Sequence, residues 1–343
     1  MRKFHIHPDF KLNGQPFNEL QLQHLAFMLI KDGSPFEEDL GNLILQWFDE
    51  NDYVLLTTSG TTGEPKEIKL NKEHMIASAK ATAEFFQVFE KTTALLCLPT
   101  RYIAGKMMFI RAMVLGWELD FVEPTSTPLS SITKEYDFCA MVPMQVENSL
   151  EHLHKIDKII VGGAKISGQL LGKLRGIATT IYETYGMTET ITHIAVKKLG
   201  EEAFTVLPHV HITTDARGCL LITAPQVTEM PVQTNDIIDK LGEQHFVWKG
   251  RIDNVVNSGG IKLFPEQIEE KLAHYIPYRF FVIGKADEHL GEKVVLVIES
   301  APYTLKEEVF EALTKYEKPK EIQFVPEFEE TPTGKIMRRK IVV

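Results

Sequence analysis

Cysteine and long apolar runs are both scarce in this sequence. Its 343 residues contain three cysteines, Cys97, Cys139 and Cys219, which are widely spaced and lie in apolar runs. Their spacing is not that of a metal site, and their odd number favours buried free thiols in a reducing compartment over disulfide bonds. No stretch reaches the roughly 18 apolar residues of a membrane span, and the N-terminus lacks a signal peptide's apolar core. We therefore expect a cytoplasmic protein without membrane insertion.

An excess of positive charge is also missing. The chain carries 37 lysines and arginines against 47 aspartates and glutamates, a formal net charge of -10 at pH 7. General affinity for nucleic acids and for anionic membranes depends on positive charge, so this balance argues against both kinds of partner. Any anionic ligand must be held by a local site.

The Walker pattern of phosphate-binding loops is absent, although a loop of related composition is present. Residues 53–56 predict a short buried strand, and the hydroxyl- and glycine-rich residues 57–69 follow it. Only two residues separate Gly60 from Gly63, and Pro65 precedes the lysine, so this is not a P-loop. Backbone N–H groups, hydroxyls and a lysine can still hold phosphate, and a polar surface turn is the alternative. The candidate phosphate-binding residues are Thr58, Ser59, Gly60, Thr61, Thr62, Gly63 and Lys66.

Apolar periodicity alternates between helix and strand as far as residue 185. Two amphipathic helices fit residues 17–50, and Asn71 can cap a helix that continues to about residue 89. Buried strands are predicted at residues 94–99, 118–122, 138–142, 158–161 and 179–185. Helices are predicted near residues 105–115, from Pro143 onward, and from Ser167 to about residue 174. This alternation implies a largely parallel sheet covered by helices, with ligands bound beyond the carboxyl ends of its strands.

The pattern changes after this region. Residues 193–248 contain short apolar runs broken by turn residues, which indicate a small β subdomain. A different unit follows residues 249–253, with strands at 280–284 and 293–299 and helices near 265–274 and 305–316. We predict an α/β fold with two domains. Residues 1–250 form a large N-terminal domain with mainly parallel sheets and the small β subdomain, and residues 251–343 form a small α+β C-terminal domain.

Six short motifs follow one another along the chain. They are residues 59–66 (Ser-Gly-Thr-Thr-Gly-Glu-Pro-Lys), 162–164 (Gly-Gly-Ala), 185–189 (Tyr-Gly-Met-Thr-Glu), Asp236, 250–253 (Gly-Arg-Ile-Asp) and 332–336 (Pro-Thr-Gly-Lys-Ile). One motif alone has a considerable false-positive risk, but all six in this order resemble the signatures of the adenylate-forming enzymes. That superfamily includes acyl-CoA synthetases, luciferases and peptide-synthetase adenylation domains. Residues 101–108 and 140–146 look most like those of the compact bacterial o-succinylbenzoate-CoA ligases of menaquinone synthesis.

The resemblance implies an ATP-dependent ligase that joins a small carboxylic acid to CoA in two steps. The carboxylate first attacks the α-phosphate of ATP, releasing pyrophosphate and leaving an acyl-adenylate, and the CoA thiol then displaces AMP. Both steps concentrate negative charge, so positioning and electrostatic stabilisation should supply most of the catalysis. The implied co-substrates and cofactor are ATP, CoA and Mg²⁺, and the expected acid is 2-succinylbenzoate.

The same resemblance implies catalytic roles for three residues. Thr188 would touch the α-phosphate, and Glu189 would hold Mg²⁺ through a carboxylate oxygen. Lys335, on a terminal loop, would bridge the attacking carboxylate and the α-phosphate. A strand-end surface carboxylate is the alternative for Glu189.

Further positions are implied to bind the nucleotide. Gly163 and Ala164 leave room for a flat base on which Tyr185 can stack, and Asp236 would accept hydrogen bonds from the ribose, a turn aspartate being its alternative. Glu183 stands where the family more often has an amide, but a carboxylate can also accept a hydrogen bond from the adenine amine. The remaining nucleotide candidates are Lys165, Thr184, Gly186, Met187 and Arg251.

The C-terminal domain is implied to be a mobile lid that rotates about Asp253. Gly259, Gly260 and Lys262 would then line the entry channel for CoA. For the acid, a second carboxylate needs a cation or several donors, and the candidates are Arg101, Lys106 and His193. Each of these three is also credible as a surface or core-edge residue.

Several alternatives stay open at the level of sequence. Another aryl- or fatty-acyl-CoA ligase would differ only in its acid pocket, and an acyl-AMP ligase would serve a carrier protein. A non-catalytic nucleotide-binding relative should lack Lys335, Glu189 or Asp236, and all three are present. A homodimer is a further expectation, because the N-terminal region looks shorter than in the family.

Overall fold

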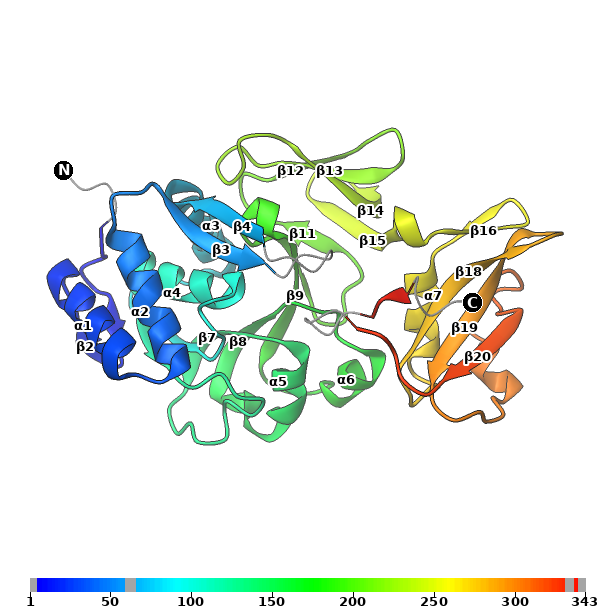
Figure 1. Cartoon of the computed structure of the whole chain (residues 1–343), viewed down its shortest axis with the longest axis horizontal. Coiled ribbons are helices and arrows are strands. Elements are labelled where there is room, and N and C mark those ends of the chain that lie inside the picture. The colour runs from blue at the N-terminus through cyan, green and yellow to red at the C-terminus, as the bar shows by residue number, and fades with distance from the viewer. Residues whose placement is uncertain (1–4, 59–65, 331–335, 339–343) are drawn as a thin grey trace.

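The computed structural model describes residues 5–58, 66–330 and 336–338. Within them, a 13-stranded sheet has the order β12-β13-β14-β15-β11-β10-β9-β8-β7-β5-β6-β1-β2. Figure 1 shows its labelled strands β7, β8 and β9 near the centre of the molecule. The helices are α1 (Glu19–Asp32), α2 (Pro35–Phe48), α3 (Lys72–Phe86), α4 (Ile103–Leu115), α5 (Pro143–Asn148), α6 (Gly168–Lys173) and α7 (Pro265–Leu272). Short 3₁₀ turns are η1 (Leu150–Lys155), η2 (Thr188–Thr190), η3 (Ile252–Asn254) and η4 (Glu307–Phe310).

One half of the large sheet is mainly parallel. Its strands are β1 (Lys11–Leu12), β2 (Gln15–Pro16), β5 (Thr93–Leu96), β6 (Glu118–Phe121), β7 (Tyr136–Met141), β8 (Ile156–Val161) and β9 (Thr180–Gly186). Every neighbouring pair from β1 to β9 is parallel, and only β2 runs against β1. Helices α4, α5 and α6 lie in the connections β5–β6, β7–β8 and β8–β9, whereas a loop joins β6 to β7. The expected α/β class is confirmed.

The other half of the sheet is antiparallel. Its strands are β10 (His193–Lys198), β11 (Phe204–Val206), β12 (His211–Thr214), β13 (Cys219–Thr223), β14 (Val232–Leu241) and β15 (His245–Arg251). These strands occupy the region expected to form a β subdomain, but β10 pairs with β9 and continues the same sheet. The antiparallel half is therefore fixed to the parallel half by backbone hydrogen bonds.

A helical hairpin and a strand hairpin lie between β2 and β5 in the chain. Helices α1 and α2 pack on each other, and Asn18 and Ser34 are their N-cap residues. Asn18 and Gln21 form a reciprocal capping box, whereas Ser34 N and Oγ donate to Glu37 Oε2. The strands β3 (Tyr53–Thr58) and β4 (Lys66–Asn71) pair only with each other. Asn71 ends β4 and accepts hydrogen bonds from the first turn of α3, as its capping role predicts.

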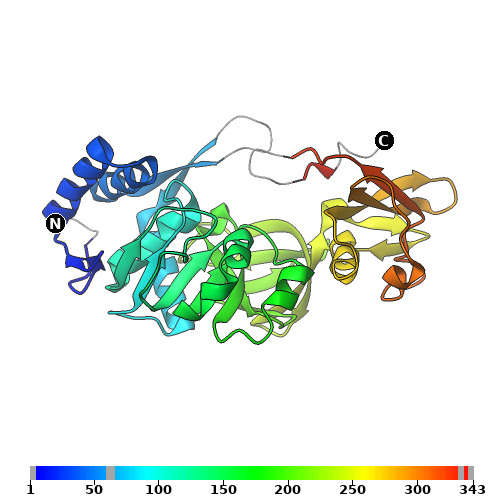
Figure 2. The ribbon, with the colours of Figure 1, turned by 90° about the horizontal axis from the view of Figure 1, so that it is seen from below.

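The C-terminal region forms a separate sheet with its own core. The strands are β16 (Val256–Ser258), β17 (Ile261–Leu263), β18 (Phe280–Asp287), β19 (Gly291–Glu299) and β20 (Glu321–Val325). Apolar side chains of α7, β18 and β19 form its core, and this region lies to one side of the large sheet (Figure 2). The helix predicted at residues 305–316 is reduced to the 3₁₀ turn η4.

Two further expectations can be compared with the structure. All three cysteines are free and buried, as their apolar surroundings predict. Among the described residues, every helix is too short or too polar to cross a membrane.

Candidate functional site

The parallel strands β8 and β9 end at the same edge of the sheet and place two of the motifs there. Gly162 follows β8, and its N–H donates to Met141 O at 3.2 Å. Gly163 has φ +84°, a conformation that favours glycine. Only a Val142 side-chain carbon would lie within 4 Å of an added Cβ there, at 3.6 Å, so the space directly beside Gly163 is not filled by neighbouring side chains.

Tyr185 and Asp236 meet although 51 positions separate them. The Tyr185 hydroxyl donates to Asp236 Oδ2 at 2.7 Å, and Trp248 Nε1 donates to Asp236 Oδ1 at 3.0 Å. Burial and the neighbouring Asp236 charge raise the pKa of Tyr185 far above its usual range, so the phenol remains a donor. Each Asp236 oxygen keeps a lone pair that can accept from a ribose hydroxyl. Nothing in the sequence around Trp248 marked it as part of this cluster.

Glu183 and Lys165, two other nucleotide candidates, are already paired. Glu183 forms an ion pair with Lys197 at 3.2 Å, across the β9–β10 ladder. Lys165 forms an ion pair with Glu270 of α7 at 2.9 Å and lies 5.9 Å from the ring centroid of Trp248. Thr184 donates to Val161 O at 3.0 Å, which ties the end of β9 to β8.

The turn η2 carries Thr188 and Glu189 beyond the end of β9. Glu189 is exposed and has no ion-pair partner among the described residues. Within those residues no group of three metal-ligating side chains occurs. Mg²⁺ is usually held by one or two carboxylates together with substrate phosphates, so a single free carboxylate at this turn fits the ion.

The next residues of this connection form a tight turn. Ile191 is buried, has φ +62° and ψ -58°, and is spanned by a hydrogen bond from Thr192 N to Thr190 O at 2.7 Å. This is a γ-turn of the rare, strained kind, and it is occupied by a β-branched residue. It turns the chain from the exposed Glu189 back into the core at His193.

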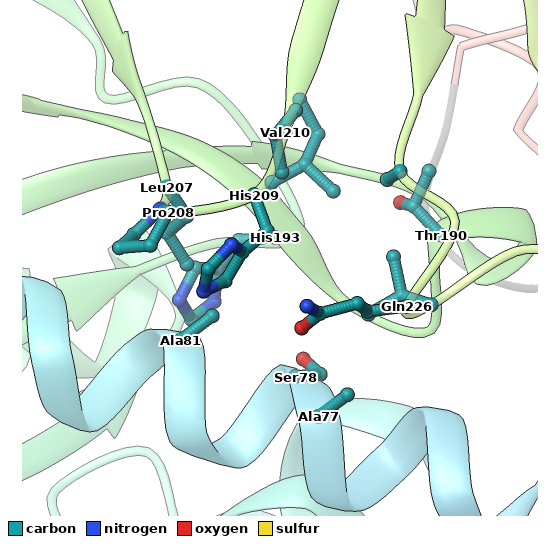
Figure 3. A pocket seen from close by; sticks show the side chains of 13 residues that line it. Ala77, Ser78, Ala81, Thr190, His193, Leu207, Pro208, His209, Val210 and Gln226 are labelled. Carbon is teal, nitrogen blue, oxygen red and sulfur yellow. The ribbon is translucent and has the colours of Figure 1, made fainter.

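A small cavity lies beside this turn, between α3 and the antiparallel strands (Figure 3). Its polar wall includes Ser78, Thr190, His193, His209 and Gln226. The cavity measures about 20 Å³, room for about one water molecule. A larger ligand can enter only if lining side chains move, and His209, whose side chain is 56% exposed, stands at its margin.

A buried arginine that sequence reasoning missed stands behind His193. Arg111 of α4 is 1% exposed, and its Nη2 lies 3.5 Å from His193 Nδ1. Burial lowers its pKa to about 9, so it stays charged at neutral pH. Among the described residues it has no carboxylate partner. The signal for it is a single charge inside the apolar run Met107-Met108-Phe109-Ile110-Arg111-Ala112-Met113.

The three acid-binding candidates lie in different surroundings. His193 lines the cavity, and burial followed by the Arg111 charge lowers its pKa well below the usual range. Lys106 is buried on α4 near the charge of Asp39 and does not line the cavity. Arg101 is exposed and stacks 5.0 Å from the ring centroid of Tyr102.

The segment around Asp253 connects the large sheet to the C-terminal region. Asp253 Oδ2 receives hydrogen bonds from Asn235 Nδ2 at 3.2 Å and from Arg251 Nη2 at 3.3 Å. Gly250 adopts φ +143°, and an added Cβ would lie 2.4 Å from a carboxylate oxygen of Glu266. Both the hinge role of Asp253 and the boundary at residue 251 stay predictions.

The remaining candidates are placed only in part. Gly259 and Gly260 form the two-residue turn between β16 and β17, both with positive φ, and Lys262 is exposed on β17. The pairing of β3 with β4 sets Thr58 opposite Lys66 at the end of the hairpin. Gly186 ends β9, Met187 precedes η2, and Ala164 follows Gly163. The residues outside the described part of the chain are Ser59, Gly60, Thr61, Thr62, Gly63 and Lys335.

Comparison with known proteins finds one matching family and several similar ligases. A family profile described as AMP-binding enzyme matches residues 18–218. The chain is 26% identical over 332 residues to a 2-succinylbenzoate–CoA ligase of Bacillus cytotoxicus, covering 84% of this chain and 69% of that protein. It is 27% identical over 342 residues to a protein of the same name from Listeria monocytogenes, covering 87% and 71%.

Two solved structures extend these similarities. An acyl-CoA synthetase (AMP-forming)/AMP-acid ligase II-like protein from Dyadobacter fermentans is 36% identical, with a TM-score of 0.64, over 93% of this chain and 97% of that one. An o-succinylbenzoate CoA synthetase from Bacillus subtilis, in complex with the acyl-adenylate intermediate OSB-AMP, has a TM-score of 0.72 at 19% identity, over 84% and 68%. The second structure is similar in fold.

Proposed function

This chain belongs to the AMP-binding enzyme family, and from that premise we propose that it ligates 2-succinylbenzoate to CoA through an acyl-adenylate. The resemblance to adenylate-forming enzymes is thereby confirmed, and the chain is an AMP-forming acid–CoA ligase that uses ATP, Mg²⁺ and CoA. The overall reaction consumes the acid, ATP and CoA and yields the thioester, AMP and pyrophosphate. The choice of acid is our proposal, supported by the names of the similar ligases.

One structural observation supports 2-succinylbenzoate as the acid. Arg111 is a buried cation without a carboxylate partner in the described structure, and it stands directly behind the cavity wall at His193. An isolated buried charge is costly unless a ligand neutralises it. An acid with a second carboxylate would supply that neutralising charge. A long fatty acid would leave the guanidinium unpaired.

The proposed roles of the other residues follow from their positions. Tyr185 and Asp236 would hold adenine and ribose, with Trp248 fixing the carboxylate of Asp236. Glu189 would hold Mg²⁺, which when bound would supply positive charge to offset the negative charge of the phosphates. Thr188 lies next to Glu189 on the same turn and would donate to the α-phosphate.

Two further assignments belong to the same proposal. Residues 1–250 would form the adenylate-forming domain, and residues 251–343 a lid that turns about Asp253 and brings Lys335 to the reacting carboxylate. We also propose a cytoplasmic location, and the homodimer remains a prediction.

The test measures pyrophosphate release and thioester formation with ATP, Mg²⁺, CoA and three kinds of acid. The acids are 2-succinylbenzoate, benzoate and medium-chain fatty acids, and the variants are Lys335→Ala, Arg111→Met and Arg111→Lys. We expect turnover of 2-succinylbenzoate alone and loss of adenylation in K335A. In R111M we expect kcat/KM to fall about tenfold or more, because the buried guanidinium attracts the second carboxylate through the intervening His193 with little screening by water. Thermal unfolding of each variant checks that it folds.

Other outcomes would test the reaction type, the substrate and the role of Arg111 separately. Turnover of fatty acids would keep the chemistry and remove 2-succinylbenzoate as the substrate. Tight ATP binding without turnover of any acid would favour the non-catalytic alternative. Normal 2-succinylbenzoate kinetics in R111M would remove Arg111 from the acid site.

A further inference from the structure

Three buried side chains from three elements form a closed hydrogen-bonded cluster at the cavity. Thr82 comes from α3, Arg111 from α4 and His193 from the first position of β10, and their exposures are 0%, 1% and 5%. Arg111 Nε donates to Thr82 Oγ1 at 3.3 Å, and Arg111 Nη2 lies 3.5 Å from His193 Nδ1. His193 Nε2 lies 3.3 Å from Thr82 Oγ1, which closes the ring of contacts.

Donor and acceptor chemistry allows one arrangement of hydrogens in this cluster. A guanidinium only donates, so His193 Nδ1 must be the acceptor and cannot carry a proton. The proton of the neutral imidazole is therefore on Nε2, which donates to Thr82 Oγ1. The Thr82 hydroxyl donates its own hydrogen to Ser78 O at 3.0 Å. Its two lone pairs receive Arg111 Nε and His193 Nε2, so the donors and acceptors of this hydroxyl are all used.

His193 separates the guanidinium from the cavity. His193 and Ser78 line the cavity, whereas Arg111 does not. The charge of Arg111 still acts on an anion inside, because buried charges are screened far less than charges in water. A charged histidine at this place would repel the arginine, and an apolar side chain would leave Nη2 without its acceptor.

We propose that His193, with Thr82, is a positioning residue that makes the ligase select an acid with a second carboxylate. The neutral imidazole accepts a hydrogen bond from the guanidinium and so fixes its orientation. The positive charge of Arg111 is thereby held just behind the cavity wall, where it can attract an anion. This inference rests on the proposed function and adds to it a specificity determinant outside the six motifs. It predicts that loss of His193 weakens the preference for the dicarboxylic acid more than it weakens catalysis.

The test compares 2-succinylbenzoate with two analogues that each keep one carboxylate. These are 4-oxo-4-phenylbutanoate, which lacks the ring carboxylate, and 2-butanoylbenzoate, which lacks the chain carboxylate. The selectivity is the ratio of kcat/KM for 2-succinylbenzoate to that for whichever analogue the enzyme accepts. His193→Leu removes the acceptor for Arg111, while His193→Asn keeps an amide oxygen near the Nδ1 position. Thr82→Val and Thr82→Ser form the second matched pair.

We expect His193→Leu and Thr82→Val to lower the selectivity at least about tenfold, mainly through KM of the dicarboxylic acid, since charge-assisted hydrogen bonds are strong. His193→Asn and Thr82→Ser should restore most of it. An equal fall for both acids in His193→Leu would mean that His193 only supports the fold and would overturn the proposal. Failure of the wild-type enzyme to use 2-succinylbenzoate would instead overturn the proposed substrate.

A second measurement needs no substrate. ¹⁵N NMR of histidine-labelled wild-type protein at pH 7 should show His193 neutral and protonated on Nε2. In Arg111→Met the same resonance should lose the signature of an Nδ1 that accepts a hydrogen bond. A His193 that is cationic or protonated on Nδ1 would contradict the arrangement, whatever acid the enzyme uses.

Discussion

The two buried cations of α4 differ in what surrounds them. Arg111 donates to Thr82 and His193, whereas Lys106 has no hydrogen-bond acceptor among the described side chains and only the charge of Asp39 nearby. Burial lowers the pKa of Lys106 from 10.5 to about 8, and the Asp39 charge opposes part of this fall. The folded protein therefore carries a desolvation cost at neutral pH that it does not carry at high pH.

Replacement of Lys106 by methionine should stabilise the fold at pH 7. The unfolded chain binds this proton more tightly than the folded protein does, so stability rises with pH between about 8 and 10.5. The difference corresponds to a cost on the order of 3 kcal/mol below pH 8, which is the upper limit of the gain in Lys106→Met. Urea unfolding at pH 7 and at pH 10 measures it, and the gain should shrink at pH 10.

The exposed Lys80 of α3 offers a matched control. Its replacement by methionine should change the free energy of unfolding little, and equally at both pH values. A gain in Lys106→Met that is the same at pH 7 and pH 10 would show that packing, and not the buried charge, is responsible.

At the scale of elements, the connection between β9 and β10 joins the motif at residues 185–189 to the cavity wall at His193. Its γ-turn at Ile191 places the exposed Glu189 two residues before the turn and the buried His193 two residues after it. A β-branched residue with positive φ costs on the order of 1–3 kcal/mol, and such strain is common at functional sites. The turn therefore fixes how the two parts of the site are oriented.

The strain can be measured by comparing alanine and glycine at two buried isoleucines. Ile191→Ala should lower the free energy of unfolding by about 2–4 kcal/mol through lost packing. Ile191→Gly should be no less stable than Ile191→Ala, because glycine accepts positive φ. Ile194 is buried in the extended strand β10. There the free energy of unfolding should be roughly 1 kcal/mol lower in Ile194→Gly than in Ile194→Ala. If the glycine variant were less stable than the alanine variant at both positions, this would argue against strain at Ile191.

At the scale of the whole molecule, the C-terminal region rests on the large sheet through α6 and α7. Lys165 pairs with Glu270 at 2.9 Å, and an added Cβ at Gly168 would lie 3.0 Å from the His274 ring and 3.2 Å from Ala273. An exposed ion pair contributes little. The close approach of Gly168 to Ala273 and His274 therefore constrains the position of the C-terminal region more than the Lys165–Glu270 ion pair does.

A large side chain at Gly168 should separate α6 from α7. We expect Gly168→Phe to increase the radius of gyration measured by small-angle X-ray scattering and to slow pyrophosphate release. Gly172→Phe, on the same short helix, should change neither, because no atom lies within 4 Å of an added Cβ there. Equal effects of the two substitutions would mean that the α6–α7 contact does not set the position of the C-terminal region.

Local patterns in the sequence were sufficient for much of the fold. The alternation of apolar runs predicts the parallel strands and their covering helices, and Asn71 marks the start of α3. Residues 193–248 look like a separate β subdomain because short strands broken by turns have only local signals. Their pairing with β9 depends on backbone hydrogen bonds between distant segments, which periodicity does not encode.

The sequence by itself determined the family and the order of its motifs, because these depend on residue types that the phosphate and nucleotide chemistry requires. Only the tertiary structure brought Trp248 to Asp236 and placed Arg111 behind His193. The physical reason is that a tryptophan in a strand and a charge in an apolar helix have no local mark of function. Their roles depend on which distant acceptor each one reaches and on how far water is excluded from it.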